Sequence, residues 1–219
     1  MVLRLTTTHR PATDLGYLLH KNPYRTHVLE TSFGRALVVF PEAIEERCTA
    51  SLMIEVDPVS LVRGKGRGGG RWDQYVNDRP YVASSYLSLA IARLFGTALT
   101  GRSKERQELA DQEIPLQANI PVVRGGSEEF LKSIFEPLGY IVEARRLPLD
   151  EKFPEWGQGP YFDLTLSASK TVKDLLTHLY VLIPVLDDSK HYYVDRDEVE
   201  KLIRKGGDWL ASHPEKDKI

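Results

Sequence analysis

The sequence predicts an α+β domain with a mostly antiparallel sheet and helices packed on one face of that sheet. In residues 161–168, Phe162, Leu164 and Leu166 alternate with polar side chains, which is typical of a strand with one face in water. Residues 84–98 carry apolar side chains at spacings of three and four, which predicts a helix of about four turns. A chain of 219 residues buries enough apolar surface to fold without a disulfide or a structural metal.

The first third of the chain mixes strands with a short helix. Thr13 or Asp14 is suited to cap a helix that ends before Asn22 and Pro23, because their side chains can accept hydrogen bonds from free backbone N–H groups. Strands are expected at residues 28–29, 36–40 and 51–56, separated by Gly34 and Pro41.

The remaining elements follow turn and capping signals. Ser127, followed by two glutamates, is typical of a helix start, and Pro137 with Gly139 ends that helix. Pro184 is expected to end a later helix. A break at residues 124–126 divides the chain into two possible lobes, residues 1–123 and 124–219. The other expected elements are a strand at residues 140–146 and helices at residues 171–183 and 195–206.

Composition limits the function without identifying it. A net charge of −2 gives no overall field that would attract nucleic acid, so such binding would need a local basic patch. Cys48 is the only cysteine, which excludes an internal disulfide and a cysteine-based zinc site and indicates a reducing compartment. The sequence shows neither the apolar core of a signal peptide nor a membrane-spanning run. We therefore expect a cytoplasmic protein with no membrane partner.

Residues 63–71 form a glycine-rich loop with four cations. The spacing does not match a phosphate-binding loop, which places a lysine and a hydroxyl residue after its last glycine. Flexible cations can nevertheless bind RNA phosphates or an acidic protein surface, and a solvated loop is the alternative. The candidate contact residues are Arg63, Lys65, Arg67 and Arg71.

Two groups of side chains have the chemistry of metal ligands. Asp187, Asp188 and His191 can hold a divalent cation, although a hydrophilic turn is the preferred interpretation. Glu55 and Asp57 end a strand, where paired carboxylates can hold magnesium, or where an aspartate can open a turn. His178 follows Asp174 by four residues, which predicts an ion pair on the surface of a helix.

Four segments of the sequence resemble one family of bacterial RNA-modifying enzymes. Residues 6–21 resemble the start of RNA 3′-terminal ribose 2′-O-methyltransferases. The other three segments are residues 74–81 with the helix that follows, residues 153–157, and residues 179–188 leading into His191 and Tyr192. The resemblance extends over essentially the whole chain.

The resemblance implies a role for the amino-terminal half of that family. That half binds a polynucleotide kinase-phosphatase-ligase and activates adenylylation of its ligase module during repair of cleaved transfer RNA. S-adenosylmethionine and a metal ion are expected only in the methyltransferase half, whose glycine fingerprint and metal ligands are not found in this sequence. We therefore expect a chain without catalytic residues or cofactor that forms a hetero-oligomer with the ligase, with RNA as a secondary partner.

Protein-binding surfaces usually depend on aromatic and arginine side chains. Two alternatives remain open, namely a metal-dependent RNA-processing enzyme that uses the carboxylates and histidine described above, and a passive RNA-binding module that uses residues 63–71. The candidate residues for partner binding are Arg79, Tyr81, Trp156, Tyr192 and Tyr193.

Overall fold

A seven-stranded antiparallel sheet organises the computed structural model, which describes residues 1–31, 34–57, 81–186, 207 and 209–219. The strand order is β2-β3-β4-β1-β5-β7-β6, and every neighbouring pair is antiparallel. The predicted α+β class and the mostly antiparallel sheet are therefore confirmed. The strands are β1 (Val2–Thr7), β2 (His27–Thr31), β3 (Gly34–Ala43), β4 (Cys48–Val56), β5 (Ile114–Arg124), β6 (Ile141–Pro148) and β7 (Gln158–Lys170).

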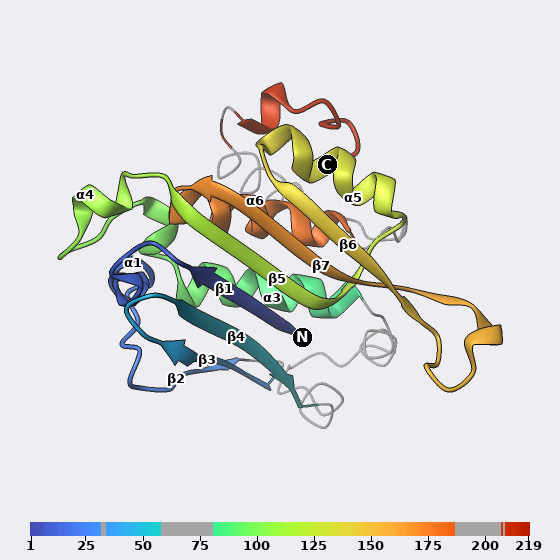
Figure 1. Ribbon diagram of the computed structural model, residues 1–219, viewed down its shortest axis with the longest axis horizontal. Coiled ribbons are helices and arrows are strands. Elements are labelled where there is room, and N and C mark those ends of the chain that lie inside the picture. The colour runs from blue at the N-terminus through green and yellow to red at the C-terminus, as the bar shows by residue number, and fades with distance from the viewer. Residues whose placement is uncertain (32–33, 58–80, 187–206, 208) are drawn as a thin grey trace, which may run out of the picture.

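Helices α3 (Tyr81–Leu94) and α6 (Val172–Val185) contact each other behind the sheet as it is drawn in Figure 1. Helix α5 (Glu128–Phe135) packs against β6 at one edge, and α1 (Leu15–Leu19) lies at the opposite end beside β4. The front face in Figure 1 has no described helix over it. Short helical turns complete the described part: Ala12–Asp14, Ala98–Thr100, α4 (Gln107–Ala110), Glu136–Leu138 and Pro154–Trp156.

The core forms because one face of each central strand is apolar. In β7, Phe162, Leu164 and Leu166 are at most 1% exposed, as their alternation predicts. Leu87 and Ile91 of α3 are fully buried in the same apolar core. No helix in the described part of the chain is long and apolar enough to cross a membrane.

The two central strands, β1 and β5, were not predicted. Strand β5 contains Pro115 and Pro121, which suggest a loop because proline cannot donate to a sheet ladder. The structure accommodates both, since β1 pairs only with residues 116–119 of β5 and the β5–β7 register shifts between Ile120 and Val123. Residue 123 therefore lies within a strand of the continuous sheet, and the division into two lobes stays a prediction.

Asp14 does not cap α1 as predicted. No side chain caps that helix, and the Asp14 carboxylate instead accepts a hydrogen bond of 2.9 Å from Nε of Arg106. A three-residue helical turn precedes α1, so Asp14 already has helical backbone angles, and its side chain is directed to the segment that contains Arg106. Helix α6 includes Pro184 and continues to Val185, two residues beyond the predicted last residue, Ile183. The helix predicted at residues 195–206 lies outside the described residues.

The capping prediction at α5 is confirmed and leads to a stability test. Oγ of Ser127 accepts from the backbone N–H of Phe130 at 3.1 Å. Ser127→Ala should lower the free energy of unfolding by about 1 kcal/mol, because a helix donor loses its partner. Urea unfolding measures this, with Ser169→Ala on β7 as a control. Equal stability of Ser127→Ala and the unmodified chain would contradict the assigned cap.

Candidate protein-binding surface

The β6–β7 connection carries the one predicted partner-binding side chain that the structure describes, Trp156. We call residues 149–157 the hairpin tip. Figure 1 shows this tip reaching away from the body of the domain at the right-hand side. A projecting segment of this kind can enter a recess on another protein without moving the sheet that carries it.

The sequence of the hairpin tip explains its shape. The side chain of Asp150 accepts from the backbone N–H of Lys152 at 2.7 Å, which closes a turn typical of aspartate. Residues 154–156 then form one helical turn, and Gly157 follows with a φ of +83° that other residues rarely adopt. The N–H of Leu149 donates to the carbonyl of Gly157 at 3.1 Å and closes the base of the tip.

The tip exposes large apolar side chains. Trp156 is 58% exposed and stacks on Phe153, with ring centroids 4.7 Å apart and planes 14° from parallel. Leu149 beside them is 59% exposed. Stacked aromatic rings on a fixed turn lose little conformational entropy when they bind, and tryptophan is frequent among residues that dominate interface energetics. The geometry is therefore suited to binding a protein.

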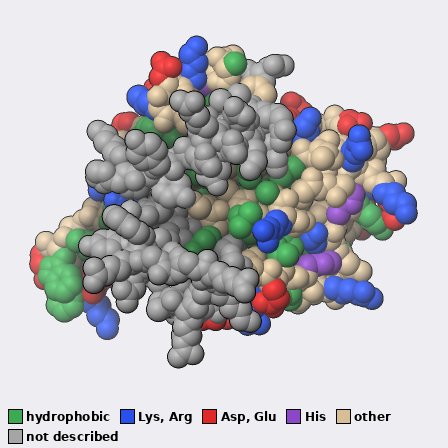
Figure 2. Space-filling model, turned by 180° about the vertical axis from the view of Figure 1, so that it is seen from behind, with side chains coloured by type: hydrophobic (Ala, Val, Ile, Leu, Met, Phe, Trp, Pro, Cys, Tyr) green, Lys and Arg blue, Asp and Glu red, His purple; other side chains and the backbone are tan. Residues whose placement is uncertain are grey.

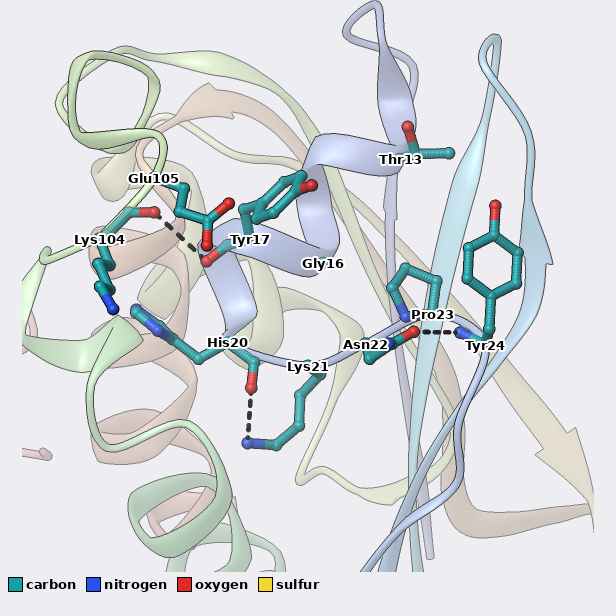
Figure 3. A pocket seen from close by; sticks show the side chains of 11 residues that line it. Thr13, Gly16, Tyr17, His20, Lys21, Asn22, Pro23, Tyr24, Lys104 and Glu105 are labelled. Atoms are coloured by element: carbon teal, nitrogen blue, oxygen red, sulfur yellow. Dashed lines mark hydrogen bonds between the residues drawn. The ribbon is translucent and has the colours of Figure 1, made fainter.

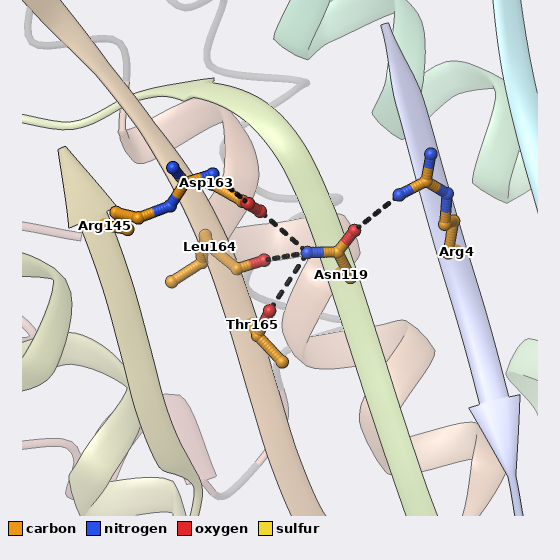
Figure 4. A network of polar contacts seen from close by, with 6 residues as sticks. All are labelled: Arg4, Asn119, Arg145, Asp163, Leu164 and Thr165. Atoms are coloured by element: carbon orange, nitrogen blue, oxygen red, sulfur yellow. Dashed lines mark hydrogen bonds and ion pairs between the residues drawn. The ribbon is translucent and has the colours of Figure 1, made fainter. Parts of the chain in front are cut away.

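The open face of the sheet is polar by comparison (Figure 4). A chain of contacts crosses four strands. Arg4 of β1 donates to Oδ1 of Asn119 at 3.2 Å, and Nδ2 of Asn119 donates to Oδ1 of Asp163 at 2.8 Å. Arg145 of β6 donates to Oδ2 of the same carboxylate at 3.1 Å. Arg145 neutralises Asp163, whereas Arg4 binds the neutral amide of Asn119, so the network links four strands and keeps one positive charge.

The other predicted site residues have different positions. Glu55 at the end of β4 is exposed and forms an ion pair of 2.7 Å with Arg35. Within the described ranges, no three His, Cys, Asp or Glu side chains are grouped as metal ligands. Tyr81 is the first residue of α3. The remaining candidates, Arg63, Lys65, Arg67, Arg71, Arg79, Asp187, Asp188, His191, Tyr192 and Tyr193, lie outside the described residues.

The predicted surface ion pair of His178 is wrong. His178 is only 5% exposed, and its Nδ1 lies 2.8 Å from the hydroxyl of Tyr140. Its ring also packs edge-on against Trp209, with centroids 4.8 Å apart. The helical spacing from Asp174 is real, but the carboxylate accepts from the hydroxyl of Thr171 at 2.8 Å. Spacing along one helix does not show that Tyr140, just before β6, and Trp209 near the carboxyl terminus cover the histidine.

Burial shifts the titration of this cluster. It lowers the pKa of His178 from 6.5 to about 4, against a smaller opposing effect of Asp174. Burial also raises the pKa of Tyr140. Both side chains are therefore neutral near pH 7, and the Tyr140 hydroxyl can donate to Nδ1 of His178.

Comparison with models of known protein families identifies the family of this chain. The whole chain, residues 1–219, matches the model described as "RNA repair, ligase-Pnkp-associating, region of Hen1". The chain belongs to this family. No curated protein sequence matches the chain.

Two solved structures resemble this ligase-Pnkp-associating region. They are described as "Structure of the Pnkp1/Rnl/Hen1 RNA repair complex" and "Structure of Pnkp1/Rnl/Hen1 complex". Each has a TM-score of 0.57, with sequence identities of 13% and 14%. Each match covers 94% of this chain but 47% of the solved one, so the chain spans about half the length of those relatives. At this identity the likeness establishes a shared fold.

Sequence reasoning missed Leu149 and Phe153 as parts of the exposed surface. A signal was present, because both are large apolar residues in a turn otherwise rich in charge and proline. Such a turn has no periodicity that would direct apolar side chains to a core. Exposed apolar residues in a conformationally restricted turn are themselves a feature of binding sites.

The His178 cluster predicts a pH dependence of stability. The unfolded chain takes up a proton at His178 below about pH 6.5, whereas the folded chain does so only near pH 4. The free energy of unfolding should therefore fall as the pH falls from 6.5 to 4, by at most about 1.4 kcal/mol per pH unit from this group. Below pH 4 this contribution should stop changing.

Urea unfolding across this pH range tests the assignment. His178→Gln keeps an acceptor for Tyr140 but cannot titrate, so its stability should depend less on pH than that of the unmodified chain. Parallel pH dependences for the two proteins would show that His178 titrates normally.

Proposed function

We propose that this chain binds the ligase-containing enzyme of a bacterial RNA repair assembly and activates adenylylation of the ligase. The match of the whole chain to a ligase-Pnkp-associating family supports this proposal. The fold shared with chains of Pnkp1/Rnl/Hen1 complexes supports it further. The partner is a polynucleotide kinase-phosphatase-ligase, contacted at its ligase module in the cytoplasm.

Activation requires that the domain binds two ligase states unequally. A ligand with the same affinity for both states leaves their populations unchanged. A tenfold shift toward the competent state requires about 1.4 kcal/mol of differential affinity. A few well-placed side chains supply free energies of that size, so the function needs a surface and no catalytic group.

The hairpin tip is the surface we assign to this role, and the exposed stack of Phe153 and Trp156 is the observation that carries the assignment. The rings are fixed by the turn at residues 153–157, so they meet a partner already ordered. The charged residues around them, Asp150, Glu151, Lys152 and Glu155, form the polar rim that usually surrounds such a centre.

The chain itself is proposed to be non-catalytic. Asp163 of the open face is neutralised by Arg145, and Glu55 is paired with Arg35. In this proposal S-adenosylmethionine and a divalent cation belong to a methyltransferase domain of the longer parent protein. The chain contributes binding energy only.

Substitution of the tip tests this function. Phe153→Ala combined with Trp156→Ala should weaken binding to the partner ligase by roughly 30-fold or more, because it removes two central anchors. Ligase adenylylation in the presence of saturating ATP should fall accordingly at limiting concentrations of the chain. Calorimetry and a radiolabelled adenylylation assay measure the two effects.

Tyr24→Ala is the matched control, because Tyr24 is an aromatic residue that is 84% exposed and lies in the connection between α1 and β2, which are at the opposite end of the domain from the hairpin tip. It should leave both binding and adenylylation unchanged. Unchanged ligase affinity in the tip variant would remove the hairpin tip from the interface. Absence of binding by the unmodified chain would refute the proposed function as a whole.

A further inference from the structure

A pocket of about 500 Å³ lies beside α1, at the end of the domain opposite the hairpin tip (Figure 3). Its volume is within the range of small-ligand sites. Two separate segments form it, residues 13–24 and residues 103–105. Its ionisable and aromatic lining consists of Tyr17, His20, Lys21, Tyr24, Lys104 and Glu105.

The pocket has a fixed framework. A Cβ at Gly16 would lie 2.8 Å from the carbonyl oxygen of Lys21 and 2.8 Å from Cδ of Pro23, so only glycine allows the chain to fold back this closely. His20 ends α1 in the left-handed conformation, with a φ of 54°. Its Nε2 lies 2.7 Å from the carbonyl oxygen of Arg102, which ties the two segments together.

The charge of the pocket is predominantly positive. Lys21 and Lys104 form no ion pair with any described carboxylate. The ammonium of Lys21 is partly buried, where it donates to the carbonyl of His20 at 3.3 Å and lies 5.9 Å from the ring centre of Phe95. Burial lowers the pKa of Lys21, which shows that its charge is incompletely compensated. An anion placed here would restore that compensation.

The acidic groups near the pocket do not cancel this charge. Asp14 is paired with Arg106, and Glu105 is the one acidic side chain in the lining. Exposed Arg25 and Arg102 are outside the lining and directly adjoin the two segments in the sequence, after residue 24 and before residue 103. Figure 2 shows basic and histidine side chains, interspersed with acidic ones, at the right-hand end of its view, which is the α1 end of Figure 1.

Two tyrosine rings add a second kind of recognition. Figure 3 shows Tyr17 and Tyr24 on either side of Gly16. Tyr17 is 44% exposed and Tyr24 is 84% exposed. The guanidinium of Arg106 lies 5.1 Å from the ring centre of Tyr17, and Asp14 holds that guanidinium in place. Tyr17 is therefore positioned by a built contact.

We propose that this pocket binds one nucleotide of a single-stranded RNA, with the lysines near the phosphate and the tyrosines beside the base. Proteins that bind single strands combine cations along the backbone with aromatic rings on which bases stack. An acidic peptide would also use the lysines, but two exposed rings in one pocket with lysines that have no described ion-pair partner are the combination typical of single-strand sites. The assignment depends on this pocket alone and is independent of the ligase proposal.

The test uses the whole chain and a fluorescein-labelled single-stranded RNA of about eight nucleotides, followed by anisotropy at several salt concentrations. Tyr24→Ala should weaken binding by roughly 5- to 150-fold, and Tyr24→Phe should retain it because the ring still stacks. Lys104→Ala should reduce the slope of log affinity against log salt by about 0.7, the contribution of one phosphate contact. Lys152→Ala at the hairpin tip is the lysine control and should leave the slope unchanged.

Several results would overturn the proposal. One is RNA affinity that is the same in Tyr24→Ala and the unmodified chain, and another is equal weakening by Tyr24→Phe and Tyr24→Ala. Competition by AMP as strong as by the RNA would indicate a mononucleotide site, and competition by polyglutamate would indicate a site for acidic peptides. Thermal unfolding identifies any variant that fails to fold. Substitutions at Tyr24 and Lys104 should not cause this, because both side chains are exposed.

Discussion

The pairing of β1 with β5 is the contact on which the sheet depends. Strand β1 comes from the first residues of the chain, and Arg4 lies opposite Asn119 across this pairing. On one side of it are β2, β3 and β4, and on the other side are β5, β7 and β6. Without this long-range pairing the two groups of strands would share no ladder, and the apolar faces of Leu5 and Ala118 would not form one core. Bringing β1 and β5 together costs conformational entropy of the chain between them, and only packing of the core compensates for this cost.

A continuous sheet also fixes the distance between its two ends. The hairpin tip extends from the β6–β7 side, whereas the pocket beside α1 lies at the other end (Figure 1). The exposed side chains of both surfaces lie outside the apolar core, so they can differ in sequence without disturbing it, whereas Gly16 of the pocket cannot. Trp156 and Tyr24 are both exposed, and each lies on a turn anchored by backbone hydrogen bonds. Binding surfaces on a rigid frame of this kind are typical of adaptor domains.

Periodic segments were predictable from the sequence, and nonperiodic ones were not. Alternation identified β7, and the spacing of apolar residues identified α3 and α6, because each element buries one regular face. Strand β5 was not predicted because Pro115 and Pro121 suggest a loop. The sheet tolerates both prolines because they lie where β1 does not pair with β5. The candidate site was only partly accessible from the sequence: residue type singled out Trp156, whose role in binding stays a prediction, whereas Phe153 required knowledge that the turn stacks the two rings. The burial of His178 depended on packing from distant segments, which no local pattern records.

The two proposals together imply a kinetic consequence for RNA repair. A domain that holds a ligase at one end and a single strand at the other makes the encounter of RNA and ligase intramolecular. The effective concentration of RNA at the ligase then depends on the geometry of the complex, and it increases only if both sites can be occupied together. Because a rigid sheet separates the hairpin tip from the pocket, occupation of one does not obstruct the other. Weak RNA binding is sufficient in such an arrangement, and it is also preferable, since a ligated product must dissociate before the next broken strand can bind.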